Sequence, residues 1–100
     1  MKAEFNKLNK AFENRVRLGV MSILIANDYA DFNRLKELLD LTDGNLASHL
    51  KSLEKLQFIE VSKEFINRKP NTKYAVTRKG KMAFESHLDA LESILRNRDK

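Results

Sequence analysis

Residues 35–50 read LKELLDLTDGNLASHL, and residues 58–77 read FIEVSKEFINRKPNTKYAVT. The first stretch places leucines at helical spacing on both sides of Thr42 and Asp43, which is typical of two helices joined by a tight turn. The second stretch alternates apolar and polar residues on both sides of a break near Pro70, as a β-hairpin does. The order predicted from these residues is helix, turn, helix and hairpin.

The size and charge of the chain fit one small basic domain. With 100 residues and 42% hydrophobic content, residues 1–100 are expected to form a single domain. The net charge is +5 and the isoelectric point is about 9.6, which suits a polyanionic partner. Between Lys63 and Lys79, six bases face one acid, so the positive charge is concentrated near the hairpin.

Several classes of protein are disfavoured by the composition. The absence of cysteine excludes a disulfide framework, a thiolate metal site and a cysteine nucleophile. The longest apolar run, Val20–Ala26, is far shorter than the ~20 residues that cross a bilayer. We therefore expect no membrane partner, no metal, no cofactor and a cytoplasmic protein. An enzyme is also disfavoured, because no Gly-rich phosphate loop and no nucleophile with a recognisable base are present.

The helix-turn-helix is predicted over residues 33–57. Its first helix runs from about Asn33 to Leu39, and Asp31 is a candidate cap for it. Thr42 is expected to cap the next helix, where burial of Leu46, Leu50 and Leu53 requires the remaining face to point outward. This outward face is expected to consist of Asn45, Ser48, His49, Ser52 and Lys55. Such small polar side chains offer donors and acceptors to base edges.

The hairpin is predicted over residues 58–77. Ile59, Val61 and Phe65 are the expected inward positions of its first strand. Residues 67–71 are expected to form a loop, because proline lacks an amide donor and asparagine favours turns. After the second strand, Thr77 is expected to cap a last helix in which Gly80 permits close backbone packing.

Two long terminal helices are predicted, over residues 1–27 and 78–98. Both carry more apolar surface than one small core needs, so their apolar rows are divided between packing within the chain and dimerisation, and we expect a homodimer. His87 lies among these apolar residues and is interpreted as a packed or interface histidine rather than a metal ligand. The residues assigned to the dimer surface are Phe5, Leu8, Phe12, Phe84, Leu88, Leu91 and Leu95.

Taken together, these elements predict an α+β, mainly helical fold, a winged helix-turn-helix with a two-stranded wing. The chain resembles the small single-domain winged-helix transcriptional regulators of the MarR-like and ArsR-like group. The motifs that carry this resemblance are Phe-x-x-Leu-Lys at 32–36, Leu-Thr-x-Gly-Asn-Leu-x-x-His-Leu at 41–50, Leu-Glu at 53–54 and Val-Thr-x-x-Gly-Lys at 76–81. They span about half of the chain, and their order is more specific than any one of them.

The resemblance implies a homodimeric repressor that binds double-stranded DNA. The helix at 43–57 would enter the major groove, and the wing would lie on the backbone or in the minor groove. The implied contacts are Asn45, Ser48, His49 and Ser52 to bases, Thr42 and Lys51 to phosphates, and Arg68, Lys69 and Lys73 from the wing. The helix at 43–57 lacks arginine, the commonest partner of guanine. Discrimination between DNA sequences by this helix is therefore expected to be modest or to depend on DNA shape.

Two alternatives stay open at this level. A winged helix can also serve as a protein-protein interaction module without binding DNA. A small-molecule effector between the domain core and the dimer helices is compatible with the sequence, whereas a metal effector is disfavoured because the chain has only two histidines and no cysteine.

Overall fold

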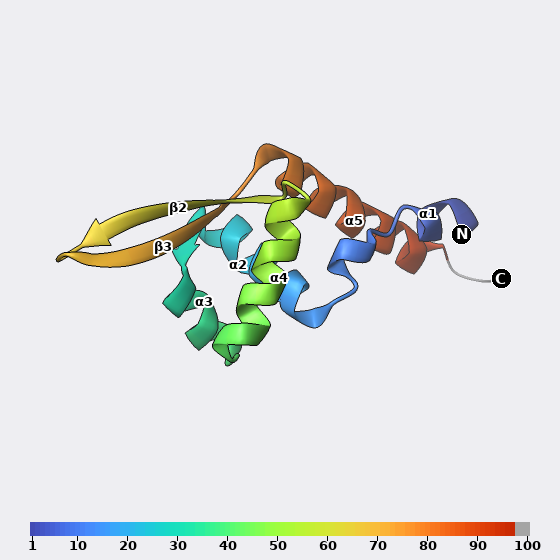
Figure 1. The fold of residues 1–100 in the computed structure, drawn as a ribbon. Helices are drawn as coiled ribbons and strands as arrows, with labels where there is room; N and C mark the ends of the chain where they lie inside the picture. Colours follow the sequence, from blue (N-terminus) through green and yellow to red (C-terminus); the bar gives the residue numbers. More distant parts are fainter. Residues whose placement is uncertain (98–100) are drawn as a thin grey trace.

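The computed structural model describes residues 1–97. The fold is α+β and mainly helical, as predicted, and in Figure 1 a two-stranded ribbon projects from one end while α1 lies beside α5 at the other. The elements in chain order are α1 (Lys2–Asn6), the 3-10 helix η1 (Lys10–Phe12), α2 (Arg15–Asn27), β1 (Tyr29–Asp31), α3 (Phe32–Leu39), α4 (Asp43–Lys55), β2 (Ile59–Ile66), β3 (Lys69–Val76) and α5 (Arg78–Arg96).

The prediction of one helix over residues 1–27 is wrong, because two asparagines divide this segment. The side chain of Asn9 accepts a hydrogen bond from the amide of Ala11 and starts η1, and the side chain of Asn14 accepts from the amides of Val16 and Arg17 and starts α2. Asparagine competes with the helical hydrogen bonds in this way and favours caps. The apolar residues that follow one helical spacing in the sequence therefore belong to three separate elements, α1, η1 and α2.

The helix-turn-helix is confirmed as α3 and α4. Asp40 follows α3 with a φ of 52°, and the amides of Asp40 and Leu41 donate to the carbonyls of Glu37 and Lys36. This pair of bonds is a Schellman motif, which closes a helix and turns the chain sharply. The hydroxyl of Thr42 then accepts from the amide of Asn45 at 3.2 Å and starts α4, as predicted.

Two further contacts fix the position of α3. The carboxylate of Asp31 accepts from the amide of Arg34 at 2.7 Å, which confirms the predicted cap. On the far side of the turn, the ammonium of Lys36 lies 2.8 Å from the carboxylate of Asp43 in the first turn of α4. The two helices are therefore tied at the turn by side chains as well as by the backbone.

The sheet has three antiparallel strands in the order β1-β3-β2. The segment 29–31, which the sequence suggested only as an extended link, is the additional strand β1. It pairs with β3 at Lys73, Tyr74 and Ala75 and reaches no further along that strand. The rest of the hairpin, from the pair Lys63 and Thr72 outward, is a ribbon of two strands.

The hairpin turn is shorter than predicted. Only Asn67 and Arg68 form it, both with positive φ, and Ile66 pairs with Lys69 directly beyond them. These backbone angles match the primed turns that join tightly paired strands. The expectation that Pro70 lies in the loop is wrong, because Pro70 is part of β3 and pairs with Phe65. Hydrogen-bonded and non-hydrogen-bonded pairs alternate along an antiparallel ladder, and Pro70 is at a non-hydrogen-bonded pair. The amide that proline lacks would point away from β2, to the open edge of β3, so no ladder hydrogen bond is lost.

The prediction of buried positions on the first strand of the hairpin is correct only at the base of that strand. Ile59 is buried, whereas Val61 is 36% exposed and Phe65 is 77% exposed. The ribbon extends past the helices that cover its base, so alternation no longer leads to burial (Figure 1). The prediction of Phe65 as an inward residue is therefore wrong.

An aromatic cluster joins the helix-turn-helix to α5. The ring of Phe12 lies 5.6 Å from that of Phe58, 5.2 Å from that of Phe84 and 5.3 Å from that of His87, measured between centroids. His87 is buried, and its Nδ1 accepts a hydrogen bond from the amide of Asn9 at 3.0 Å. His87 is thus a packed histidine that anchors the N-terminal segment.

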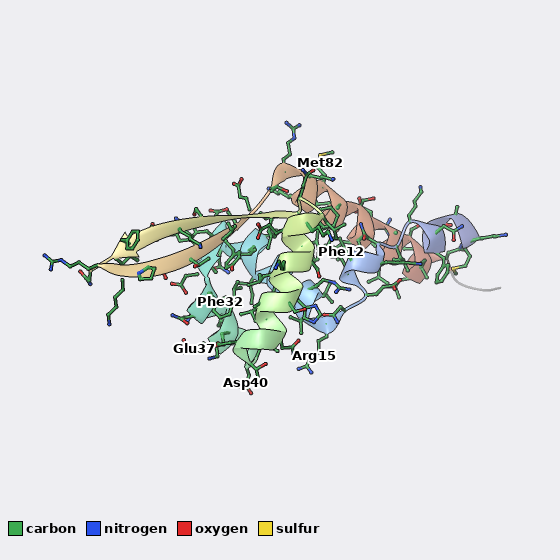
Figure 2. The ribbon with its side chains drawn as sticks, in the orientation of Figure 1. Phe12, Arg15, Phe32, Glu37, Asp40 and Met82 are labelled. Atoms are coloured by element: carbon green, nitrogen blue, oxygen red, sulfur yellow. The ribbon has the colours of Figure 1, made fainter. Side chains whose placement is uncertain are left out.

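The last helix presents one buried row and one exposed row. Its buried side includes Phe84, His87 and Ala90, whereas Leu88, Leu91 and Leu95 are exposed. Phe12 and Phe84 lie in the core of this chain (Figure 2 shows Phe12 turned into the body), so their assignment to a dimer surface is wrong. The helix ends at Arg96, and residue 98 of the predicted helix lies outside the described residues.

The start of α5 packs directly on the backbone of Phe58. A Cβ added to Gly80 would lie 2.1 Å from the carbonyl oxygen of Phe58, closer than any real contact. The same carbonyl accepts from the amide of Thr77, whose hydroxyl donates to the carbonyl of Gln57 at 2.6 Å. The prediction that Gly80 permits close backbone packing is confirmed.

We expect Gly80→Ala to lower the free energy of unfolding by about 3 kcal/mol, because the clash is with backbone and cannot be relieved by a rotamer change. Gly44→Ala is the matched control, since a Cβ there meets no atom within 4 Å and alanine favours the helix. Urea unfolding followed by circular dichroism measures both. Equal midpoints for the two variants would contradict this account of α5 packing.

Candidate nucleic-acid interface

The outward face of α4 is polar and small. Leu46, Leu50 and Leu53 are buried, and this fixes the rotation of the helix about its axis. Asp43, Ala47 and Glu54 are exposed on α4, and so are five side chains that offer hydrogen bonds or positive charge, namely Asn45, Ser48, Lys51, Ser52 and Lys55. We call helix α4 with these five side chains the recognition helix.

Hydrogen-bonding capacity on this face is largely available to a partner. The hydroxyl of Ser52 donates to the carbonyl of Ser48 at 3.2 Å and keeps its lone pairs as acceptors. Thr42 is exposed at the start of the helix, where its hydroxyl is engaged in the cap. The backbone amides of the first turn also carry the positive end of the helix dipole, which favours an anion such as phosphate.

His49 lies at the flank of the recognition helix rather than on its outermost side. It is half-buried, and its Nδ1 lies 3.3 Å from Nη1 of Arg17 in α2. The Nε of Arg17 in turn donates to the carbonyl of Ala11 at 2.7 Å. Since arginine only donates, Nδ1 of His49 is the acceptor and its Nε2 carries the proton.

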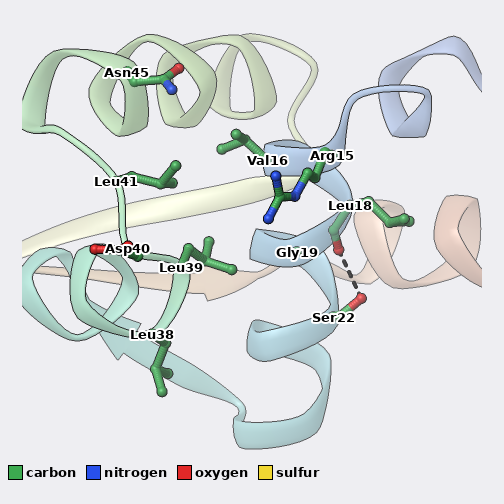
Figure 3. Close-up of a pocket in the computed structure, with 10 residues that line it drawn as sticks. All are labelled: Arg15, Val16, Leu18, Gly19, Ser22, Leu38, Leu39, Asp40, Leu41 and Asn45. Atoms are coloured by element: carbon green, nitrogen blue, oxygen red, sulfur yellow. Dashed lines mark hydrogen bonds between the residues drawn. The ribbon is translucent and has the colours of Figure 1, made fainter.

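A groove lies beside the first turn of the recognition helix, between α2 and the turn that follows α3. Its volume is about 650 Å³, and Figure 3 shows the guanidinium of Arg15 reaching into it from α2. Asn45 forms part of its wall on the side of α4. The remaining lining residues are Val16, Leu18, Gly19, Ser22, Leu38, Leu39, Asp40 and Leu41.

The three cations predicted for the wing lie in two places. Arg68 occupies the turn and Lys69 the first position of β3, so both are at the tip of the ribbon. Lys73 lies at its base, where its ammonium is 3.7 Å from the centre of the Tyr29 ring. This cation-π contact holds Lys73 against β1. The tip therefore carries Arg68 and Lys69 without Lys73.

Sequence reasoning missed two residues of this surface. Arg17 contacts the recognition helix from α2, and nothing in the local pattern around it signals that contact. Phe65 stands exposed near the tip of the wing, where alternation had suggested burial. A signal for Phe65 existed in the length of the predicted hairpin, since eight-residue strands reach beyond a core of this size.

A metal site and a membrane span have no basis within residues 1–97. This part of the chain brings together no group of three or more His, Cys, Asp or Glu side chains able to hold a metal ion. None of its helices is both long and apolar enough to span a bilayer.

Comparison with known proteins identifies the class. A family model described as a winged helix DNA-binding domain matches residues 16–95. Because this match covers most of the chain, the protein belongs to the winged-helix DNA-binding family. The resemblance to winged-helix transcriptional regulators is thereby confirmed.

One related sequence and two solved structures illustrate the similarity. An uncharacterized protein of Methanocaldococcus jannaschii is 39% identical over 88 residues, which are 88% of this chain and 96% of that protein. The structure of a transcriptional regulator homologue from Pyrococcus horikoshii OT3 superposes with a TM-score of 0.84 at 32% identity, covering 98% of this chain and 99% of that one. A MarR-family regulator from Enterococcus faecalis V583 gives 0.72 at 22% identity over 95% and 82%, which shows a shared fold.

The contact between His49 and Arg17 predicts a pH dependence of stability. Burial, and then the positive charge of Arg17, lower the pKa of His49 below its ordinary value of 6.5. As the pH falls through that value, the unfolded chain takes up a proton that the folded chain resists, so stability present above it is lost. We expect His49→Gln, which keeps an acceptor for Arg17, to lose less melting temperature than the native protein between about pH 7.5 and 5.5. Identical losses would contradict this assignment.

Proposed function

We propose that this protein is a homodimeric repressor of transcription that binds double-stranded DNA through the recognition helix and the wing. The observation that carries the proposal is the pairing, on one small domain, of an exposed polar helix face with a projecting cationic ribbon. The membership of the winged-helix DNA-binding family supports the same reading.

In this proposal the recognition helix enters the major groove. Asn45, Ser48 and Ser52 present amide and hydroxyl groups to base edges, and Lys51 with the amides near Thr42 binds phosphates. His49 would add its Nε2 donor at the flank, held in that tautomer by Arg17. The absence of arginine from α4 implies that direct readout supplies only part of the specificity.

The wing supplies affinity without reading bases directly. Arg68 and Lys69 at the tip reach phosphates beyond the major groove, and Lys73 at the base strengthens the positive field. Each such contact releases counterions from the duplex, so binding weakens as salt rises. The basic stretch from residue 63 to 79 is where this effect is concentrated.

The terminal helices supply the dimer. Leu88, Leu91 and Leu95 form an exposed apolar row on α5, and Phe5 of α1 is exposed near the same end of the molecule. Contiguous apolar surface of this kind on a soluble domain marks an interface. A two-fold dimer would place two recognition helices on half-sites about 34 Å apart, as symmetric operators require. Occlusion of such a site would repress transcription.

A small-molecule effector would find room beside the recognition helix. The groove of about 650 Å³ joins apolar side chains to the cation of Arg15 and includes Asn45. It lies between α2 and the turn after α3, a different place from the one expected between the core and the dimer helices. A ligand there would act on the position of the first turn of α4.

Affinity for a 30-base-pair duplex of random sequence, measured across a salt series, tests the DNA-binding proposal. The native protein is expected to lose affinity steeply as salt rises. Arg68→Ala combined with Lys69→Ala should reduce the slope of log affinity against log salt by about 2 per protomer, because two phosphate contacts are lost.

The matched control is Lys2→Ala combined with Lys7→Ala, which removes the same charge at the opposite end of the molecule. This pair should leave the slope nearly unchanged. A flat salt response of the native protein would instead favour the alternative, in which the same surface contacts a protein.

Sedimentation velocity tests the dimer. Leu88→Glu combined with Leu95→Glu should convert the protein to a folded monomer of 11.6 kDa, because both side chains are exposed within one protomer and charge would be buried at the interface. Met82→Glu is the control, since Met82 is exposed on another face of α5 (Figure 2). A native protein that sediments as a monomer, or a double variant that stays dimeric, would refute this interface.

A further inference from the structure

The outer half of the wing contributes no buried side chain to the core of the protein. β1 ends its pairing with β3 at Lys73, so everything beyond is a ribbon of two strands that projects past the helices (Figure 1). The turn at its tip is closed by the backbone angles of Asn67 and Arg68 and by the pairing of Ile66 with Lys69. No buried side chain lies between residues 60 and 73.

Phe65 stands on this ribbon as an isolated aromatic ring. It is 77% exposed, the highest value among the exposed large apolar side chains of the described residues. In the register of the hairpin it pairs with Pro70, which is rigid and apolar. Alternation places the pair on the same face of the ribbon as the buried Ile59, and so on the side of the sheet that the helices cover.

Positive charge surrounds this ring. Lys63 lies two residues before it on the same face of its strand, and Arg68 and Lys69 lie just beyond it at the tip. The one nearby acid, Glu64, is on the opposite face and accepts a hydrogen bond from the side chain of Asn71 at 3.3 Å. An apolar ring with cations on two sides complements a surface that is apolar inside and anionic at its rims.

We propose that Phe65 is a wedge residue that enters the minor groove of duplex DNA and inserts its ring between base pairs, while Arg68 and Lys69 bind the flanking phosphates. This inference deepens the proposed function and rests on it. Apolar wedges of this kind partly unstack a base step and bend the duplex. The minor groove is about 6 Å wide, so the side chains at the tip of the ribbon, rather than the ribbon itself, would enter it.

A wedge at this position would also add specificity to the part that the recognition helix supplies. Pyrimidine-purine steps such as TA and CA unstack more readily than others, so the cost of insertion depends on sequence at a place where no base edge is read. The wing would thereby contribute discrimination through deformability. This contribution fits a recognition helix that carries no arginine.

Fluorescence of a single introduced tryptophan tests the insertion, because the native chain contains none. In Phe65→Trp, addition of a random-sequence 30-base-pair duplex is expected to quench most of the indole emission as the ring stacks on bases. Ile66→Trp is the matched control, since Ile66 is the next residue, is exposed and points to the opposite face of the ribbon. Its emission should change little.

Phe65→Ala provides a second, independent measurement. It is expected to weaken duplex binding about tenfold through loss of stacking. The salt slope should stay at the native value because no cation is removed, in contrast to the loss expected for the variant without Arg68 and Lys69. The exposed position of Phe65 leaves the fold intact, which circular dichroism verifies.

Three results would overturn the wedge. Equal quenching in Phe65→Trp and Ile66→Trp, or none in either while DNA binding is retained, would show that the ring does not insert. Native affinity of Phe65→Ala would show that it contributes nothing. A loss of self-association in Phe65→Ala, with DNA affinity unchanged, would assign the ring to contact with a second copy. Failure of the proposed function is distinguishable, since the native protein would then not bind the duplex at all.

Discussion

The backbone of Phe58 is the point on which the arrangement of the domain depends. Its amide donates to the carbonyl of Leu53 to close α4, and its carbonyl receives the amide of Thr77 and lies against Gly80. Its ring packs on that of Phe12. Because one residue ends the recognition helix, begins the hairpin and seats α5, these elements cannot move independently of one another.

This joint has a direct consequence for the binding surface. The two strands of the hairpin begin and end side by side, with Ile59 paired to Val76. The direction of the wing is therefore fixed at the C-terminal end of the recognition helix. The Schellman motif at Asp40 and the cap at Thr42 set the other end of α4. Backbone hydrogen bonds at both ends and the side-chain cap at Thr42 hold the polar face and the cationic ribbon in fixed relation, with the exposed ion pair of Lys36 and Asp43 as a weaker addition.

The cationic tip of the wing and the exposed leucine row of α5 lie on different elements of the molecule. Arg68 and Lys69 lie at the tip of the ribbon, whereas the exposed leucines belong to α5, whose C-terminal end lies beside α1 (Figure 1). A dimer joined at the apolar end would carry its two wings outward along a duplex. In the proposed function, association and nucleic-acid binding would therefore use different elements of one small domain.

The amino-acid sequence by itself determined the helix-turn-helix, its capping residues, the buried face of α4 and the need for glycine at position 80. These features follow from spacing and from local hydrogen bonding, which act within a few residues. Only the tertiary structure decided that Phe12 lies in the core, that Arg17 contacts His49 and that Phe65 lies outside the core. Such outcomes depend on where one element ends relative to another, and periodicity along a chain carries no information about that distance.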